Sequence, residues 1–354
     1  MGHSTKVESV KTSTIGRPMA TYDPFPVEPS NSPSDMRGEA ISSGGSSACG
    51  ALEKNSLSNL REPARNLVAH RSIAIGRLSK LRPFHPTVQR LLSIPVESGS
   101  AADEFELILQ RDPALASRLL VVANSPLYGF RDRPESVSQI VALMGLEGVR
   151  SLAITLAIGS HLRDSGTTGP VRAVWGHSLA TAVIAEAIGT AAEEEVPFLY
   201  SAGLLHDLGR LGLLNIAGPQ YAGVLTRKYF DFEESLLLED VLFGCAHDDA
   251  GAFLGRSWGF PEPLCDCIRH HHKPQAAEGN VLLQHIVRLA CSMAGSLGMG
   301  EVRCERETPA VPPDSLAERI RESPAMQPEC LRSRIQKLVE ALASADRHPQ
   351  AGAP

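Results

Sequence analysis

The stretch Leu204-Leu205-His206-Asp207-Leu208-Gly209-Arg210 places an imidazole beside a carboxylate, within an apolar run that is typical of a buried helix. An aspartate is rarely buried without a partner, so this position needs a compensating group. A divalent cation would provide one, because imidazole and carboxylate together suit a hard or borderline metal ion. A hydrogen bond between His206 and Asp207, or a surface position at the helix end, would also explain the pair. The doublet alone leaves these interpretations open.

More histidines lie around this doublet in the sequence. With it they span roughly 95 residues, each in or beside an expected helix. Helical bundles build metal sites in this way, from side chains on facing helices that project into a common core. Each histidine could instead be an ordinary core or surface residue, and the run from His270 to His272 could be a cation cluster at a helix end. The pattern as a set favours a divalent metal site formed by His177, His206, Asp207, His247, His271 and His272.

The composition indicates an intracellular helical protein. Hydrophobic residues make up 43% of the 354 residues and aromatic residues only 5%, so aliphatic side chains must fill the core. The net charge of −6 provides no general phosphate-binding surface, and we expect no nucleic-acid partner. No uninterrupted apolar run reaches the roughly 18 residues needed to cross a bilayer, so we expect no membrane partner. The seven irregularly spaced cysteines favour reduced thiols in the cytoplasm.

The chain divides by composition into a tail, two helical lobes and a second tail. Residues 1–64 are rich in Ser, Gly, Pro and Asn, which predicts a disordered tail. Residues 65–164 contain short apolar helices without strand-like alternation. A link at 165–170 leads to a second helical lobe at 171–298. Residues 299–354 form a polar tail.

Local signals mark several helix ends. Asp112-Pro113 is typical of an N-cap followed by proline in the first helical position. Asn124-Ser125-Pro126 should end the same helix. Gly145 and Gly148 are expected to separate two helices. In the second tail, the segment from Cys330 to Ser344 could form an amphipathic helix that packs back on the protein or pairs with a second copy in a homodimer.

From about Leu78 to Pro274 the chain resembles an HDOD domain, a signalling relative of the HD and HD-GYP phosphohydrolases. In the first lobe the resemblance rests on Asp112-Pro113-Ala114-Leu115 and Ala123-Asn124-Ser125. In the second lobe the motifs follow in the family's order: Trp175-Gly176-His177-Ser178, Ala202 to Gly209, Phe243 to His247, Trp258-Gly259-Phe260-Pro261 and His271-His272-Lys273-Pro274. The resemblance implies an all-α, two-lobed helical bundle over residues 65–298, with an HD-like C-terminal lobe, in the bacterial cytoplasm.

The chain departs from the HD phosphohydrolases at two places. His177, His206 and Asp207 match metal ligands of these enzymes, but Cys291 stands where the resemblance would place a late aspartate. Thiolate can bind zinc, yet it is a poor ligand for hard cations. Lys273-Pro274-Gln275 replaces the G-Y-P signature. These departures argue against cyclic dinucleotide hydrolysis by the HD-GYP route.

Two functions follow from the resemblance. The first is a non-catalytic signal-transduction module, without catalytic residues, that couples a signal to partner proteins through protein or nucleotide binding. Its motif or binding residues would be Asp112, Pro113, Asn124, Ser125, Trp175 and Arg210. The alternative is a metal-dependent phosphohydrolase acting on a nucleotide or cyclic dinucleotide. His177, His206 and Asp207 would then hold the cation, the other three histidines would complete the site or grip phosphate, and Arg210 could touch a phosphate.

Overall fold

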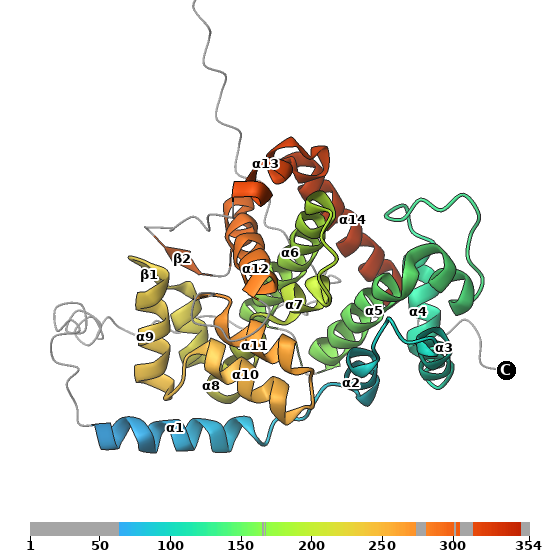
Figure 1. Cartoon of the computed structure of the whole chain (residues 1–354). Coiled ribbons are helices and arrows are strands. Elements are labelled where there is room, and N and C mark those ends of the chain that lie inside the picture. Colours follow the sequence, from blue (N-terminus) through green and yellow to red (C-terminus); the bar gives the residue numbers. More distant parts are fainter. Residues whose placement is uncertain are drawn as a thin grey trace, which may run out of the picture.

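The computed structural model describes residues 64–164, 166, 168–273, 281–300, 302–304 and 314–347. These residues are almost entirely helical (Figure 1), so the predicted all-α class is confirmed. The tail predicted at 1–64 lies outside the described residues except for its last residue. The structure therefore describes the two helical lobes and the C-terminal helices.

The first part of the chain forms five helices: α1 (Ala64–Leu78), α2 (Pro86–Ser93), α3 (Ala101–Gln110), α4 (Pro113–Ala123) and α5 (Val137–Asp164). Helices α2 to α5 pack together as one lobe. Helix α1 packs instead against α8, α9 and α10 of the second lobe, below which it runs in Figure 1. The first lobe is therefore built without the helix that precedes it in sequence.

Local sequence explains the ends and the bend of these helices. Asp112 caps α4 by accepting a hydrogen bond from the backbone N–H of Leu115 at 3.0 Å. The two helices expected around Gly145 and Gly148 are one element, α5, that bends at Gly145. Only Gly145 leaves the helical conformation, with a φ of 72° that glycine adopts without strain. The prediction that Gly148 also breaks the helix was wrong.

The second lobe contains α6 (Gly169–Ala192), α7 (Leu199–Leu205), α8 (Leu208–Thr226), α9 (Phe232–Phe243), α10 (His247–Ser257), α11 (Glu262–His270) and α12 (Val281–Ala294). Helix α6 is buried along most of its length and packs against both α7 and α12. Its sequence is apolar around most of its circumference, as a central helix requires. Helix α10 packs between α8 and α11. The HD doublet lies at the turn between α7 and α8.

Several elements, one between α8 and α9 and the others after α12, were not predicted from periodicity. A π-helical segment (Gly295–Met299) follows α12, and the two-residue strands β1 (Lys228–Tyr229) and β2 (Arg303–Cys304) pair in parallel. Helix α13 (Asp314–Glu322) and a short 3₁₀ segment (Pro324–Met326) lead to α14 (Pro328–Arg347).

Helix α14 joins the two lobes. It packs against α4 of the first lobe and α6 of the second, and Figure 1 shows it lying across both. Asp346 near its end pairs with Arg118 at 2.5 Å and with Arg163 at 2.6 Å. Leu331 and Ile335 are buried within the same chain. The amphipathic face of this helix is thus already covered by the protein's own lobes.

Two helices are long and apolar enough to cross a membrane by length and composition alone. They span Val137–Arg163 and Val281–Met299, and 56% and 33% of their most apolar windows are buried inside the fold. The first bends at Gly145, and the second carries metal-ligating side-chain types on a face turned toward α6. Core helices of folded domains pass the same test, so these two carry little weight as membrane spans.

A glycine pair permits the close approach that places the doublet. A methyl group on Gly209 would lie 1.8 Å from the carbonyl oxygen of His247 and 2.6 Å from the backbone nitrogen of Gly251. We expect Gly209→Ala to lower the free energy of unfolding by about 2–3 kcal/mol, because α8 and α10 would have to separate. Gly223→Ala on the same helix, where the methyl group meets nothing within 4 Å, should raise it by about 0.5–1 kcal/mol. Urea unfolding of both variants measures the difference, and equal stabilities would contradict the backbone contact.

Candidate metal centre

Five segments of the second lobe contribute side chains to one buried cluster. His177 lies on α6, His206 and Asp207 lie at the α7–α8 turn, and His247 begins α10. The other members, His271, His272 and Cys291, lie at the end of α11 and on α12. All six residues predicted for the metal site are therefore in the cluster, as is the cysteine in the late-aspartate position. The side chains of His177, His206, Asp207, His247 and His271 are at most 2% exposed.

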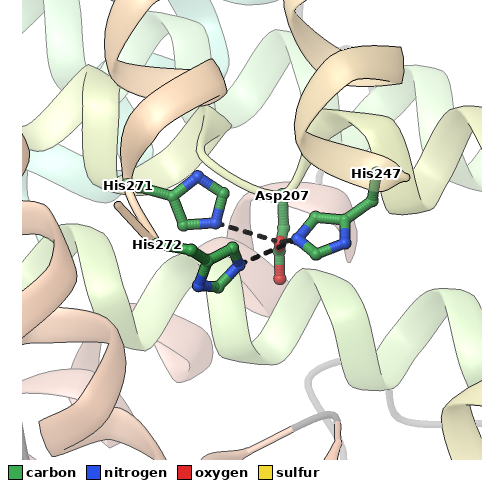
Figure 2. Close-up of side chains that lie close together, drawn as sticks. All are labelled: Asp207, His247, His271 and His272. Carbon is green, nitrogen blue, oxygen red and sulfur yellow. Dashed lines mark hydrogen bonds and ion pairs between the residues drawn. The ribbon is translucent and has the colours of Figure 1, made fainter. Parts of the chain in front are cut away.

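The first group of ligand atoms surrounds one oxygen of Asp207 (Figure 2). Asp207, His247, His271 and His272 each offer an atom within 4.8 Å of the others. The Oδ1 atom of Asp207 lies 3.3 Å from Nε2 of His247 and 3.8 Å from Nε2 of His271. The Nε2 atom of His272 lies 2.9 Å from that of His247. These are four donor atoms around a space that one metal ion could occupy.

The second group lies against the other oxygen of the same carboxylate. His177, His206 and Cys291 offer atoms within 4.8 Å of one another. The Oδ2 atom of Asp207 lies 3.5 Å from Nε2 of His206 and 4.0 Å from Nε2 of His177. The Sγ atom of Cys291 lies 3.5 Å from the same nitrogen of His177. Asp207 thus stands between the groups, with one oxygen directed to each.

Hydrogen bonds at Nδ1 orient the rings. The Nδ1 atoms of His177, His206 and His271 lie 2.9, 2.7 and 2.7 Å from the carbonyl oxygens of Met299, Gly203 and Ile268 respectively. A carbonyl oxygen only accepts, so Nδ1 must carry the proton in each ring. When the ring is neutral, the Nε2 atom carries the lone pair, and it faces the cluster. This pattern, one nitrogen fixed by a backbone carbonyl and the other left to bind, is typical of histidines that ligate metals.

The rings need a positive charge between them. The Nε2 atoms of His177 and His206 lie 3.2 Å apart, and both rings donate through Nδ1. Two neutral rings would therefore direct lone pairs at each other. Nearby, among the described residues, the Asp207 oxygens have ion-pair neighbours, including Arg210 beside Oδ1, but accept no hydrogen bond, and Nε2 of His271 has no hydrogen-bond partner. A bound cation would satisfy all of these atoms together, so the residues fit a divalent metal ion.

Glu239 on α9 orients a fourth histidine, His247. Its Oε2 atom accepts from the backbone N–H of His247 at 2.8 Å and lies 2.6 Å from Nδ1 of that ring. Its Oε1 atom accepts from Arg210 at 3.0 Å and from the hydroxyl of Tyr221 at 2.8 Å. Burial opposes ionisation of Glu239, but His247 and Arg210 lower the pKa of its carboxyl to about 2. Carboxylate–histidine pairs of this kind fix the tautomer and orientation of imidazoles that bind metals.

Arg210, for which the sequence allowed a contact with phosphate, is fully buried in the structure. Its Nε atom lies 3.1 Å from Oδ1 of Asp207, and its guanidinium lies over the ring of Phe232. Together with its bond to Glu239, this makes Arg210 a cation that holds two carboxylates in place. Its role in the structure is to position Asp207.

Charges fix the protonation of the cluster. Burial opposes ionisation of Asp207, but Arg210 and the surrounding histidines hold the pKa of its carboxyl well below the usual range. Burial also opposes protonation of His206, while Asp207 and Cys291 favour it, and the pKa of His206 is raised overall. Burial and the neighbouring histidines lower the pKa of His271 well below its ordinary value. The neighbouring acidic groups thus favour a proton on His206, which a bound metal ion would have to displace.

The cysteine is prepared to act as a thiolate. Burial would raise the pKa of the Cys291 thiol, but the positive character and hydrogen bonding of His177 and His206 lower it to about 7. Thiolate is the form that binds metals. The other buried cysteines behave oppositely: burial raises the pKa of Cys267 and raises that of Cys245 to about 12. Cys291 is therefore distinguished from them by its neighbours.

The other predicted binding residues lie away from this cluster. Asp112, Pro113, Asn124 and Ser125 lie at the two ends of α4, where Asn124 donates to the carbonyls of Leu120 and Pro134 at 2.9 Å. Trp175 is buried on α6. Asp112, Asn124 and Ser125 make capping and turn hydrogen bonds, and Asp112 also pairs with His85 at 3.9 Å.

Sequence reasoning missed Glu239 and Tyr221. A signal was present, because Glu239 interrupts the apolar run Leu236-Leu237-Leu238 before Val241 and Leu242. Glutamate is rarely fully buried without a partner. The sequence did not reveal that its partners were Arg210 and His247.

An all-helical lobe with a buried histidine–aspartate cluster defines an HD-related helical domain. The HDOD domain profile matches residues 81–274, which is more than half of the chain. The chain therefore belongs to the HDOD family, an HD-related family associated with signal transduction.

Solved structures share this fold. An HDOD domain protein of unknown function from Geobacter sulfurreducens is 25% identical, with a TM-score of 0.61, over 80% of this chain and 97% of that one. A candidate signal transduction protein from Marinobacter aquaeolei VT8 is 22% identical, with a TM-score of 0.57, and the match covers 80% of this chain and 67% of that one. A candidate phosphohydrolase from Shewanella amazonensis SB2B is 20% identical, with a TM-score of 0.53, and the match covers 78% of this chain and 98% of that one. The last two show likeness of fold alone.

Among curated proteins, an uncharacterized protein of Treponema pallidum (strain Nichols) is 28% identical over 177 residues. The match covers 48% of this chain and 34% of that protein. The chain thus spans about a third of the length of this relative.

Proposed function

We propose that this HDOD protein is a signalling module whose HD-like lobe holds a divalent metal ion and passes a signal to partner proteins. The supporting observation is the orientation of the imidazoles: three rings are fixed at Nδ1 by backbone carbonyls and a fourth by Glu239, and their Nε2 atoms face Asp207. In the signalling role, the metal would join α6, α8, α10, α11 and α12 at one point. Partner binding would then depend on how these helices are held together.

The donor set favours zinc over magnesium. Histidine nitrogens dominate both groups, and the second group adds the thiolate of Cys291. Nitrogen and sulfur donors suit zinc and other borderline ions, whereas magnesium requires oxygen ligands in octahedral geometry. An aspartate at position 291 would shift the preference of the second group toward harder ions such as manganese.

Metal content tests this proposal. Untagged protein, purified without chelator, should contain at least about one zinc ion per chain by elemental analysis. Cys291→Asp, dialysed against equal zinc and manganese, should take up relatively more manganese than the unchanged chain. The control is Cys330→Asp, since Cys330 is exposed on α14 and outside both groups. Folded protein that takes up no metal, even when dialysed against zinc, would contradict the proposal.

A second candidate function is hydrolysis of phosphate esters. The favouring observation is that Asp207 directs Oδ2 to one ligand group and Oδ1 to the other. A carboxylate between two metals is a common part of hydrolytic two-metal sites, in which the ions activate water and neutralise charge on phosphoryl oxygens. In this chain Arg210 would hold that carboxylate and Glu239 would hold His247. His272 and Cys291 are the least buried ligands and mark the side nearest to solvent.

Hydrolysis is tested with the metal-loaded protein. The substrates would be bis(p-nitrophenyl) phosphate and a panel of nucleotides and cyclic dinucleotides. Turnover that disappears in a His206→Ala, Asp207→Ala double variant would support the hydrolase. Metal binding without turnover on any of these substrates would leave the signalling module as the function.

A further inference from the structure

A cavity of about 710 Å³ lies where the two lobes meet. Its walls come from the α1–α2 link, the end of α5, the start of α6, α8 from Leu208 to Ala222, and Trp258 at the end of α10. Leu208, Leu211 and Asn215 line it from α8 at helical spacing of three and four. Arg210, which pairs with Asp207, follows Leu208 by two residues and so projects from a different side of the helix. The cavity and the metal centre thus lie on different faces of α8.

The cavity is apolar inside and basic at its rim. Leu208 and Leu214 are buried among its lining, and Phe84 contacts Trp258 edge to face at 5.0 Å. Lys80 and Arg82 are exposed in the α1–α2 link. None of the lining residues is acidic. Neither cation forms an ion pair with a described residue, so both charges at this rim lack an anion from the described part of the chain.

We propose that this cavity binds a small organic anion with a flat apolar body, of the chemical class of a nucleoside monophosphate. Its volume lies within the range of about 300–1,000 Å³ that is typical of small-molecule sites. The body would enter between α8 and Trp258, and the anionic group would remain at the rim beside Lys80 and Arg82. Burial of the apolar body would supply most of the affinity, and the two cations would select for negative charge.

Such a ligand would touch both lobes at once. His161 and Leu162 at the end of α5 line the cavity from the first lobe, and α8 lines it from the second. The same helix begins directly after Asp207. Binding would therefore favour one arrangement of the lobes, which is what a signalling module needs from an input. Ligand binding in this cavity does not require metal, because no residue of the candidate metal centre lines the cavity.

The test uses the fluorescent anion 8-anilinonaphthalene-1-sulfonate with the full chain. We expect this probe to bind saturably. Adenosine monophosphate should displace it, whereas inorganic phosphate at the same concentration should not. Displacement by inorganic phosphate as well would show that a bare anion is sufficient and would overturn the proposed class. The neutral parent N-phenyl-1-naphthylamine should bind at least about tenfold more weakly, since it lacks the charge that the rim would attract.

Variants locate the bound probe. Lys80→Ala with Arg82→Ala should weaken it about tenfold, while Arg90→Ala with Arg111→Ala, two exposed cations outside the cavity, should leave it unchanged. Ala222→Phe should abolish binding by filling the space, with its fold checked by circular dichroism and thermal unfolding. The site is refuted if the Lys80–Arg82 variant binds as tightly as the unchanged chain. Metal content is measured in parallel, so that failure of this site is distinguished from failure of the metal centre.

Discussion

Replacing Asp207 with asparagine should abolish metal binding at both ligand groups and leave the chain folded. The side chain keeps its size, but the carboxylate that faces both groups through its two oxygens loses its charge. Changes in the second coordination shell alone lower metal affinity by about 10–100-fold, so the loss of this central ligand should exceed about 100-fold. Zinc content and competitive titration against a chelating dye measure the loss.

The control for this prediction is Asp248→Asn. Asp248 follows His247 on α10 but belongs to neither ligand group. Circular dichroism should show the same helical content in both variants. An Asp207→Asn protein that keeps its zinc would mean that the ion binds elsewhere in the chain. An Asp248→Asn protein that loses it would mean that the loss reflects a general disturbance of α10.

Replacing Glu239 with alanine should lower the free energy of unfolding by about 3–5 kcal/mol. Its carboxylate accepts hydrogen bonds from Arg210, Tyr221 and the backbone of His247, all of which are fully buried. Without it, Arg210 is left with Asp207 as its buried carboxylate partner among the described residues, and two neutral donors lose this acceptor. Removing one partner of a buried ion pair has a large cost because the other charge stays desolvated. Urea unfolding in the presence of chelator measures this without a contribution from bound metal.

Two further variants separate charge from hydrogen bonding. Glu239→Gln keeps an acceptor oxygen and should lose less stability than Glu239→Ala. Glu233→Ala removes an exposed glutamate of the same helix that pairs with Lys273, and it should change stability by less than about 0.5 kcal/mol. A Glu239→Ala protein as stable as the Glu233→Ala protein would show that the buried network contributes little.

The contribution of the Glu239 carboxyl to stability should depend on pH. Because the pKa of Glu239 is lowered to about 2 in the folded chain, its contribution to stability is fully present above the unfolded pKa and is lost as the pH falls toward 2. The difference in free energy of unfolding between the unchanged chain and Glu239→Gln should therefore become smaller as the pH falls toward 2.

The sequence predicted the helical class because it depends on local signals, and residue types pointed to side chains that the fold brings together. Apolar spacing marked the helices, Asp112 marked the start of α4, and the histidines and the HD doublet stood out as residue types. Gly148 was misread because a glycine within a helix has the same letter as one that breaks it. Of these two glycines, Gly145 has a positive φ and Gly148 does not.

By itself, the sequence determined which residues could bind a metal and that they would lie on helices of one lobe. The tertiary structure decided that Asp207 faces two ligand groups, that Glu239 holds His247, and that α1 and α14 pack where they do. The physical reason is distance along the chain. Helix periodicity and capping act over a few residues, whereas Cys291 meets His177 across 114 residues of sequence, where only the packing of whole helices sets the contact.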